Sequence, residues 1–590
     1  MDSSALTPND VPSLDPGIRD KFHNYDAILD EIGGFGIYQK LILFLVLIPA
    51  IIPNGFYNYN IVFMSATPAE YWCRLPVDNI SISDLPHLLP LEQRNGEIVH
   101  SRCMMFDLNY ANLTKQEIAN TVRIYNGTLS VVPCRSGWDF DHSVYESTTV
   151  TEWGLVCDKE VLSTISFASS TFGGLFGAFI WAFIADRFGR KKGYFSMIAF
   201  QLTFAIASAF SPNLLAYCMF RMCIGMCTSF VYTLGLLMSI EITGTKTRAL
   251  MSVICSIGYT SSVLLLLLIA YFVRDWHHFA LASSVPLLSL FFLIPFFPES
   301  PRWLLAQGRL KELEVYVRKV ARVNRVQLDP KFDQNLPLIL ANLDRHEDEE
   351  TANLVDLFRT PNLRKKTLIL AFINFCNSGI FTGLNLYAPA FGGNPHWSAF
   401  LTNMVEFPPY LFAQQICDRL GRRLSLFYFM LFCSIFCLVT AGITGGTALT
   451  VLSLAAKFCI TITFLVAELY EEESFPTVVR GAGHSFTSVV SQFAGVGAPF
   501  VVNLGNAFLV LPLVVFGCLS VVGAGTTLFM PETVYKQLPQ TLDDGENFGK
   551  HMRWSTIVSL VPPKRPKKTR VQLVGFKANL KEEGPYTITG

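Results

Sequence analysis

Ionisable side chains occur inside several long apolar segments of the chain, where their chemistry is restricted. They are Arg221, Glu241, Glu406, Lys457 and Glu468. An ionisable group at membrane depth is costly, so it usually faces a cavity or a partner. Glu406 precedes a pair of prolines, and a buried carboxylate there suits an amine through charge-assisted hydrogen bonds. Two alternatives stay open: Glu406 pairs internally with Lys457, or Lys457 lies at the membrane interface.

The apolar segment 367–390 contains several amides. Asn374, Asn377 and Phe381 follow one another at helical spacing, which places them on one face, and Asn385 lies one turn further on. Amides facing lipid would lose their hydrogen bonds. We therefore expect this face to line a cavity, with packing between helices as the alternative.

The pattern D-R-x-G-R-[KR] occurs twice, at residues 186–191 and 418–423. Each copy places a carboxylate at the end of an apolar segment, a glycine in a tight turn and cations beyond it. Glycine permits the turn, and the aspartate can cap a helix or pair with a base. We expect conformational contacts from Asp186, Arg187, Gly189, Arg190, Asp418, Arg419, Gly421 and Arg422. Glu241 joins this charge network or extends its side chain to the interface.

These residues require membrane-spanning elements to position them. The 590 residues are 51% hydrophobic and 16% charged, against about 25% charged in soluble proteins. A bilayer core needs about 20 apolar residues per helix. Twelve segments qualify, namely 39–62, 161–184, 193–211, 214–240, 249–273, 278–297, 367–390, 396–417, 425–444, 447–470, 482–503 and 508–530. The sequence predicts an all-α membrane protein with two six-helix bundles.

Composition excludes several functions. Lys plus Arg and Asp plus Glu both number 46, so net charge gives no reason to expect nucleic acid as a partner. No nucleophile, metal or cofactor constellation and no phosphate-binding G-x-x-x-x-G-K-[ST] motif occurs. We expect no enzyme activity, no cofactor and no metal, with a small solute and the lipid bilayer as partners.

The basic residues predict the orientation. They cluster in the connections after the second, fourth, sixth and eighth apolar segments, which places both termini in the cytosol. The resulting division is a cytosolic tail at 1–38, a bundle at 39–297, a cytosolic loop at 298–366, a bundle at 367–530 and a cytosolic tail at 531–590. We also expect the N-terminal tail to lead into an uncleaved first helix, because it lacks the basic start of a signal peptide.

The loop at about 65–158 is predicted to be extracellular. It contains three glycosylation sequons, beginning at Asn79, Asn112 and Asn126. It also contains four cysteines, Cys73, Cys103, Cys134 and Cys157. An even number in an oxidising compartment predicts two disulfides, with three pairings open.

The duplicated turn resembles the signature loop of the major facilitator superfamily. Residues 298–305 read P-E-S-P-R-W-L-L and include Glu299 and Arg302; residues 473–480 read E-S-F-P-T-V-V-R and run from Glu473 to Arg480. With W-G-L-V-C-D at 153–158, these resemble motifs of its organic cation, anion and zwitterion transporter family. The resemblance implies two bundles that rock about a central site, with the motif charges acting in gating.

The same resemblance implies site residues. Glu406, Lys457 and Gln492 occupy positions that can face substrate in the family, and Gln492 stands where a charge usually selects the substrate. Glutamine is neutral and can donate and accept. The resemblance implies a plasma-membrane secondary carrier of small organic ions or zwitterions (amine, carnitine-like or organic acid). The alternatives are a proton-coupled sugar-type facilitator and a transporter-like protein that binds without transport. The coupling ion, substrate identity and homo-oligomerisation stay open.

Overall fold

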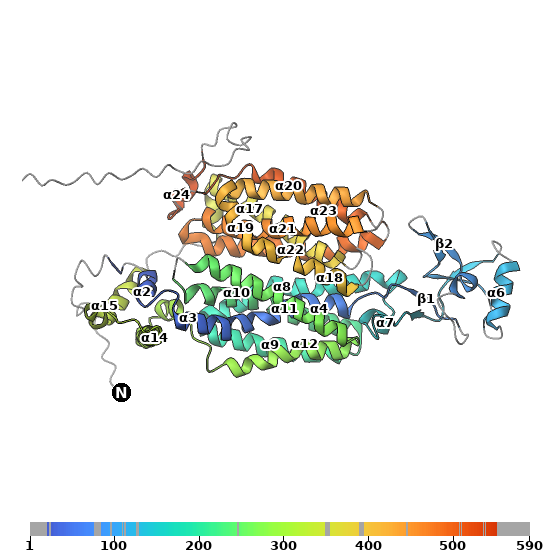
Figure 1. Ribbon diagram of the computed structural model, residues 1–590, viewed down its shortest axis with the longest axis horizontal. Coiled ribbons are helices and arrows are strands. Elements are labelled where there is room, and N and C mark those ends of the chain that lie inside the picture. Colours follow the sequence, from blue (N-terminus) through green and yellow to red (C-terminus); the bar gives the residue numbers. More distant parts are fainter. Residues whose placement is uncertain are drawn as a thin grey trace, which may run out of the picture.

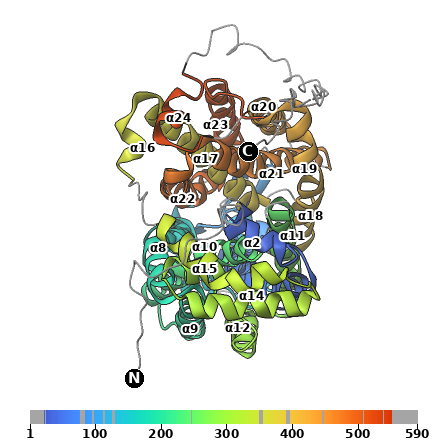
Figure 2. The same ribbon diagram turned by 90° about the vertical axis from the view of Figure 1, so that its left-hand side faces the viewer.

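The structure is a computed structural model that describes residues 21–22, 25–75, 84–94, 97–108, 110, 114–124, 129–244, 247–347, 354–388, 395–443, 447–506, 508, 510–534, 536 and 539–550. Its long helices form two bundles that lie side by side, one from each half of the chain (Figures 1 and 2). This is the all-α, two-bundle architecture that the sequence predicts.

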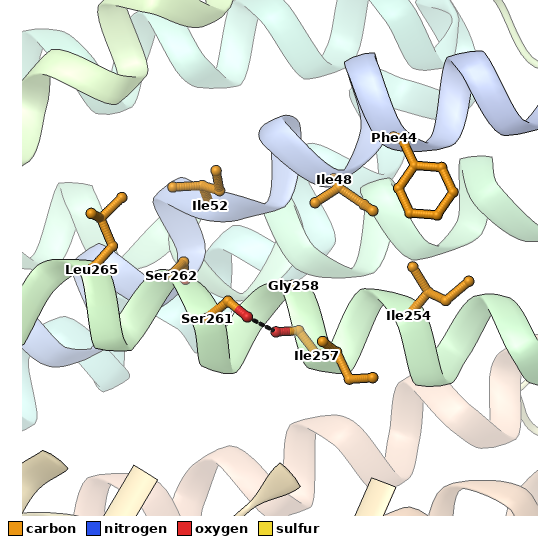
Figure 3. Close-up of a pocket in the computed structure, with 9 residues that line it drawn as sticks. All are labelled: Phe44, Ile48, Ile52, Ile254, Ile257, Gly258, Ser261, Ser262 and Leu265. Carbon is orange, nitrogen blue, oxygen red and sulfur yellow. Dashed lines mark hydrogen bonds between the residues drawn. The ribbon is translucent and has the colours of Figure 1, made fainter. Parts of the chain in front are cut away.

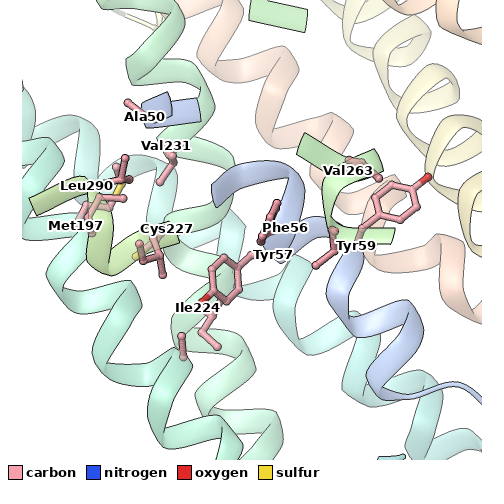
Figure 4. Packing of buried hydrophobic residues seen from close by; sticks show 14 of the residues in the cluster. Ala50, Phe56, Tyr57, Tyr59, Met197, Ile224, Cys227, Val231, Val263 and Leu290 are labelled. Atoms are coloured by element: carbon pink, nitrogen blue, oxygen red, sulfur yellow. The ribbon is translucent and has the colours of Figure 1, made fainter. Parts of the chain in front are cut away.

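The first bundle is built from the N-terminal half. It contains α3 (Ile37–Ile42), η1 (Leu43–Leu47) and α4 (Ile48–Met64) as one continuous element, then α8 (Glu160–Phe188), α9 (Arg190–Ala209), α10 (Leu214–Glu241), α11 (Arg248–Phe272) and α12 (Trp276–Leu290), with η6 (Phe291–Leu293). Side chains from several of these helices meet in its core, where Tyr57 of α4 lies near Ile224 and Cys227 of α10 (Figure 4).

The second bundle repeats this plan. It contains α17 (Pro361–Tyr387), α18 (Pro395–Met404), α19 (Phe407–Leu420), α20 (Arg422–Ala441), α21 (Thr447–Ser474), η8 (Thr477–Val479), α22 (Arg480–Asn503), η9 (Leu504–Asn506) and α23 (Leu511–Thr527). Helix α17 begins at Pro361, inside the stretch 298–366 that the sequence assigned to the central loop. Proline fits the first turn of a helix because its missing N–H has no partner there.

Among the described residues, nine helices are long and apolar enough to cross a membrane. The other predicted spans fall on α9, α23 and the pair α18 and α19. Helix α9 begins with three basic residues, and α23 has 17 residues. Pro408 and Pro409 lie in the first turn of α19, and the helix is interrupted at Glu406, between α18 and α19. The break follows from proline, which cannot continue the hydrogen-bond ladder of a preceding helix.

One end of the bundles, which we call the terminal face, carries helices from the N-terminal segment, the connection between the two halves and the C-terminal segment (Figure 1). These are α2 (Tyr25–Glu31), α13 (Pro301–Ala306), α14 (Leu310–Asn324), α15 (Pro330–Glu347), α16 (Asp356–Arg359) and α24 (Leu542–Asn547). Leu29 of α2 packs with Trp303 of α13 and Leu336 of α15 in one apolar cluster. Helix α24 lies in the predicted tail from 531, and Glu546 accepts the backbone N–H groups of Asn362 and Leu363 at the start of α17.

The opposite end carries the small domain formed by the long first loop, and we call it the domain face (Figure 1). Its elements are β1 (Tyr71–Cys73), α5 (Leu85–Leu88), β2 (Leu91–Arg94), β3 (Glu97–His100), β4 (Met104–Phe106), α6 (Lys115–Ile124), β5 (Val131–Pro133), β6 (Trp138–Phe140), α7 (Thr149–Trp153) and η4 (Cys157–Lys159). The strands pair antiparallel as β1 with β6, β2 with β3 and β4 with β5.

Two disulfides close this domain. Cys73 bonds to Cys134 and Cys103 bonds to Cys157, with Cα–Cα distances of 5.2 and 5.7 Å. The structure thus selects one of the three pairings that the sequence left open. The sequon residues Asn79, Asn112 and Asn126 lie outside the described residues.

Among the described residues, the bundles meet mainly where α8 packs against α22 and where α11 packs against α18 and α19. At the domain face, the His396 ring of α18 stacks on the Phe63 ring of α4 with centroids 5.4 Å apart. The same ring lies 6.0 Å from the rings of Tyr145 and Tyr271, so three rings of the N-terminal half surround one of the C-terminal half.

Candidate functional site

The central feature between the bundles is a buried ion pair. Lys457 Nζ lies 2.9 Å from Glu406 Oε1, and both side chains are 1% exposed. Glu406 lies at the break between α18 and α19, and Lys457 lies within α21. Internal pairing, which the sequence left as an alternative for Glu406, is what the structure shows. Lys457 is not at an interface, because it is fully enclosed.

Other side chains complete the environment of the pair. Thr260 Oγ1 of α11 and Tyr410 OH of α19 donate to Glu406 Oε2 at 2.9 and 3.2 Å. Lys457 Nζ lies 3.1 Å from the centroid of the Phe381 ring, a cation–π contact. Thr260 belongs to the N-terminal half, so Glu406 is held by both halves of the molecule.

Thr260 and Tyr410 are site residues that the sequence analysis missed. Tyr410 follows Glu406 by four residues, a spacing that could have indicated it. Thr260 lies 146 residues away in the chain, and only the packing of α11 against α19 brings it to Glu406.

The amides of α17 are placed differently from expectation. Asn377 is fully buried, donates to the Thr463 carbonyl at 3.3 Å and accepts from Thr463 Oγ1 at 3.0 Å. It therefore joins α17 to α21, and the prediction that it lines a cavity is wrong for this conformation. Because the amide is fully buried, a neighbouring helix rather than solvent supplies its hydrogen-bond partners.

Asn374 and Asn385 also differ from Phe381 in their surroundings. Asn374 donates to Glu471 Oε1 at 2.5 Å, and Glu471 also contacts His484 Nδ1 at 3.1 Å. Asn374 thus belongs to a polar group nearer the terminal face. Asn385 is buried in α17, and of these amide and aromatic residues only Phe381 touches the ion pair among the described contacts.

Gln492 lies between the two bundles. Its Nε2 donates to Ser229 Oγ of α10 at 3.0 Å. Gln492, which stands where the family usually has a charge, therefore forms a neutral hydrogen bond from the C-terminal half to the N-terminal half. Gly495, one turn further along α22, approaches Thr171 of α8. Gln492 is therefore placed where relative motion of the bundles would break its hydrogen bond.

The first D-R-x-G-R turn assembles a charge cluster at the terminal face. Arg190 Nη1 pairs with Asp186 Oδ1 at 2.9 Å. Glu299 Oε1 accepts the Lys191 N–H at 3.1 Å, near the start of α9, where the helix dipole favours an anion. Ser300 Oγ donates to Glu241 Oε2 at 2.5 Å. Gly189 has φ +104°, and a Cβ there would collide with the Glu299 carboxylate.

The second turn builds the same cluster in the other bundle. Arg422 pairs with Asp418 at 3.2 Å and with Glu473 at 2.9 Å. Glu532 Oε1 accepts the Arg422 N–H at 2.8 Å, at the start of α20. Thr533 Oγ1 donates to Glu473 Oε2 at 2.5 Å. Gly421 has φ +88°, and its Cβ would meet Glu532 as that of Gly189 would meet Glu299.

Glu532 is another residue that the sequence analysis missed. The signal was present, because residues 531–533 read P-E-T at the place where residues 298–300 read P-E-S. Each half therefore carries a complete copy: an aspartate and an arginine in the turn, a glutamate near the end of the fourth helix, and a glutamate after the sixth.

The remaining predicted gating residues lie at the edges of these clusters. Arg302 bonds to Asp26 of α2, and Arg248 at the start of α11 bonds to the same carboxylate. Arg480 begins α22 within electrostatic reach of Glu472. Arg187 and Arg419 are exposed and take no part in the hydrogen bonds and ion pairs described above.

A groove with a volume of about 470 Å³ lies apart from these sites (Figure 3). Apolar side chains of η1, α4 and α11 form most of its wall, including Phe44, Ile48 and Leu265. The Ser261 hydroxyl donates to the Ile257 carbonyl of its own helix at 2.7 Å. Its lining contains none of the residues predicted to bind substrate.

Comparison with known proteins decides the family. A family model described as "Sugar (and other) transporter" matches residues 116–541. The beta-alanine transporter of Drosophila melanogaster is 35% identical over 551 residues, which cover 89% of each chain. The chain belongs to the organic cation/carnitine transporter family of the major facilitator superfamily. It is a multi-pass membrane transporter rather than an enzyme.

Other family members show the same relation. The carcinine transporter of Drosophila melanogaster is 34% identical, with 93% of this chain and 83% of the relative covered. The organic cation/carnitine transporter 2 of Homo sapiens is 34% identical, with 88% and 93% covered. The inward open structure of the xylose transporter XylE from E. coli has a TM-score of 0.58 at 14% identity, covering 86% of this chain and 99% of that one. This likeness shows the major facilitator fold.

Proposed function

We propose that this transporter is a secondary carrier of small organic ions at the plasma membrane, with zwitterions as its preferred substrates, working by alternating access. Relatives that cover most of the chain are named for beta-alanine, carcinine and carnitine. Beta-alanine and carnitine each carry a cationic and an anionic group. Those names favour a carrier of organic ions over the sugar-type alternative.

The Glu406–Lys457 pair is the observation that carries the substrate class. A solute with one charge that displaced either partner would leave the other charge buried and uncompensated, which is strongly unfavourable. A zwitterion can supply an ammonium group to Glu406 and a carboxylate to Lys457 at once. The exchange then leaves neither charge uncompensated, because one charged contact within the protein is replaced by two charged contacts to the solute. Phe381 adds an aromatic face for the cationic group.

The orientation of the chain belongs to the same proposal. The terminal face carries both described ends of the chain, the two charge clusters and the basic turns, as the cytosolic side of a membrane protein does. The domain face carries two disulfides, which persist in an oxidising compartment. We place the terminal face in the cytosol and the domain face outside the cell.

Alternating access follows from the contacts between the bundles. His396 and its ring partners close the domain face, and Glu406 joins α11 to α19 at the centre. The duplicated charge clusters hold the turns of each bundle together, so each bundle can move as a unit. Rocking would separate α18 from α11 at the domain face and open the ion pair toward the outside.

The test is uptake by the purified protein in proteoliposomes, with labelled beta-alanine, carnitine, an organic amine and an organic acid. We expect saturable uptake of the zwitterions. Gln492→Asp should shift selectivity toward cations and Gln492→Arg toward anions, while Phe493→Leu, a neighbouring exposed position, serves as the control. Absence of saturable flux for every solute would contradict the proposal that the protein is a carrier. Unchanged selectivity in both Gln492 variants would show that Gln492 does not belong to the substrate site.

A further inference from the structure

A second buried charge lies in the first bundle, away from the proposed substrate site. Arg221 of α10 is fully buried, with 0% of its surface exposed. Its Nη1 donates to Asn60 Oδ1 at 3.0 Å, and its Nη2 donates to the Tyr57 carbonyl at 3.5 Å. Both acceptors belong to α4 and both are neutral.

None of the described residues supplies a counter-charge to the Arg221 guanidinium. The titratable groups close to it are Tyr57, Tyr217 and Cys218, each neutral in its ordinary protonated form. Its Nε has no hydrogen-bond partner in the described structure. The contrast with Lys457 is direct, because that equally buried cation has Glu406 beside it.

A second unpartnered donor lies on the same helix face. Tyr217 precedes Arg221 by one turn and is fully buried; Ser65 lies close to its hydroxyl, but no described group meets hydrogen-bond geometry with it. The neighbouring polar groups are used elsewhere: Asn60 Nδ2 donates to Ser283 Oγ at 3.3 Å, and Tyr57 OH contacts Ser284 Oγ at 3.0 Å. Two free donors, one of them cationic, therefore lie between α4, α10 and α12.

We propose that Arg221 binds a chloride ion, held by the guanidinium and the Tyr217 hydroxyl within the first bundle. A buried cation needs an anion, and the protein supplies none from its described side chains. Chloride is small, carries one charge and accepts hydrogen bonds without bringing further polar atoms that would need partners. The ion neutralises the charge that ties α10 to α4, so chloride stabilises the bundle and supports transport.

Asn60→Asp provides the decisive variant, because it places a carboxylate where Asn60 Oδ1 already contacts Arg221. The carboxylate of this variant should then replace chloride as the counter-ion of Arg221. Asn58→Asp is the matched control: it makes the same change on the same helix at an exposed position, and Arg221 keeps its neutral surroundings. Both are compared with the unchanged protein in chloride and in gluconate at constant sodium and ionic strength.

The measurements are the thermal midpoint of the purified protein and equilibrium binding of radiolabelled chloride. We expect chloride to raise the midpoint of the unchanged protein and of Asn58→Asp by several degrees. Asn60→Asp should match the chloride midpoint already in gluconate and lose most of the specific chloride binding. Equal midpoints of the unchanged protein in both salts would overturn the proposal. Chloride binding that persists undiminished in Asn60→Asp would do so too, because the ion would then lie elsewhere.

Discussion

At the scale of single residues, the chemistry of the site depends on two charges that neutralise one another. Glu406 and Lys457 are each almost completely enclosed, and Thr260, Tyr410 and Phe381 fill their surroundings. The sequence predicted that both charged side chains face a cavity or a partner, because an ionisable group inside an apolar segment is costly. Their pairing stayed one alternative of several, because it depends on how α19 and α21 pack.

Lys457→Met should destabilise the protein by about 3–5 kcal/mol, because it leaves the Glu406 carboxylate buried without a counter-ion. The double variant Glu406→Gln with Lys457→Met should recover most of that loss, since glutamine can still accept from Thr260 and Tyr410. Zwitterion uptake should be absent in both. Thermal unfolding and uptake measured on the same preparations check this, and a double variant as unstable as the single one would contradict the pairing.

At the scale of elements, the duplicated turns show what a local pattern can and cannot predict. Gly189 and Gly421 were expected to permit tight turns, and both have positive φ. The capping of α9 by Glu299 and of α20 by Glu532 was not predicted, because each carboxylate comes from a segment about 110 residues further along the chain. Likewise, Asn377 shares a face with Phe381 in the sequence, yet it bonds to Thr463 on the neighbouring helix.

Gly189→Ala and Gly421→Ala should each cost about 1–3 kcal/mol, because the backbone there adopts a conformation that other residues rarely tolerate. Each Cβ would also push the carboxylate of Glu299 or Glu532 away from the start of its helix. The thermal midpoint and the uptake rate should both fall. Gly497→Ala, where a Cβ meets open space, is the control and should leave the midpoint nearly unchanged.

The disulfides concern a separate element, the domain formed by the first loop. Replacing Cys73 and Cys134 together with serine removes a link between positions 61 residues apart, which should cost about 2–5 kcal/mol of local stability. Limited proteolysis should then cut the loop domain faster and leave the helical bundles intact. Equal cleavage of bundles and loop would show instead that the link stabilises the whole protein.

At the scale of the whole molecule, the two halves are held by a few contacts that motion must break. Gln492 bonds to Ser229 across the halves, and His396 lies among rings of the other half. The two-bundle fold could be predicted from twelve apolar segments and a repeated turn. The contacts between bundles could not, because they belong to one conformation and join residues more than 100 positions apart in the chain.

A short thiol-reactive cross-linker between Ser229→Cys and Gln492→Cys should stop uptake, because it prevents the bundles from separating along α10 and α22. Uptake should return when the link is reduced. Each single cysteine variant treated with the same reagent is the control. Continued uptake by a fully cross-linked protein would mean that this contact does not change during transport.

We expect a zwitterion to cross the membrane by replacing the contact between Glu406 and Lys457 with contacts to its own two charges. Counterflow tests it most directly: proteoliposomes preloaded with unlabelled beta-alanine are diluted into a trace of labelled beta-alanine, and the label inside is followed with time. We expect transient accumulation above equilibrium for the unchanged protein and none for the Glu406→Gln, Lys457→Met double variant. No accumulation by the unchanged protein, or equal accumulation by both proteins, would contradict it.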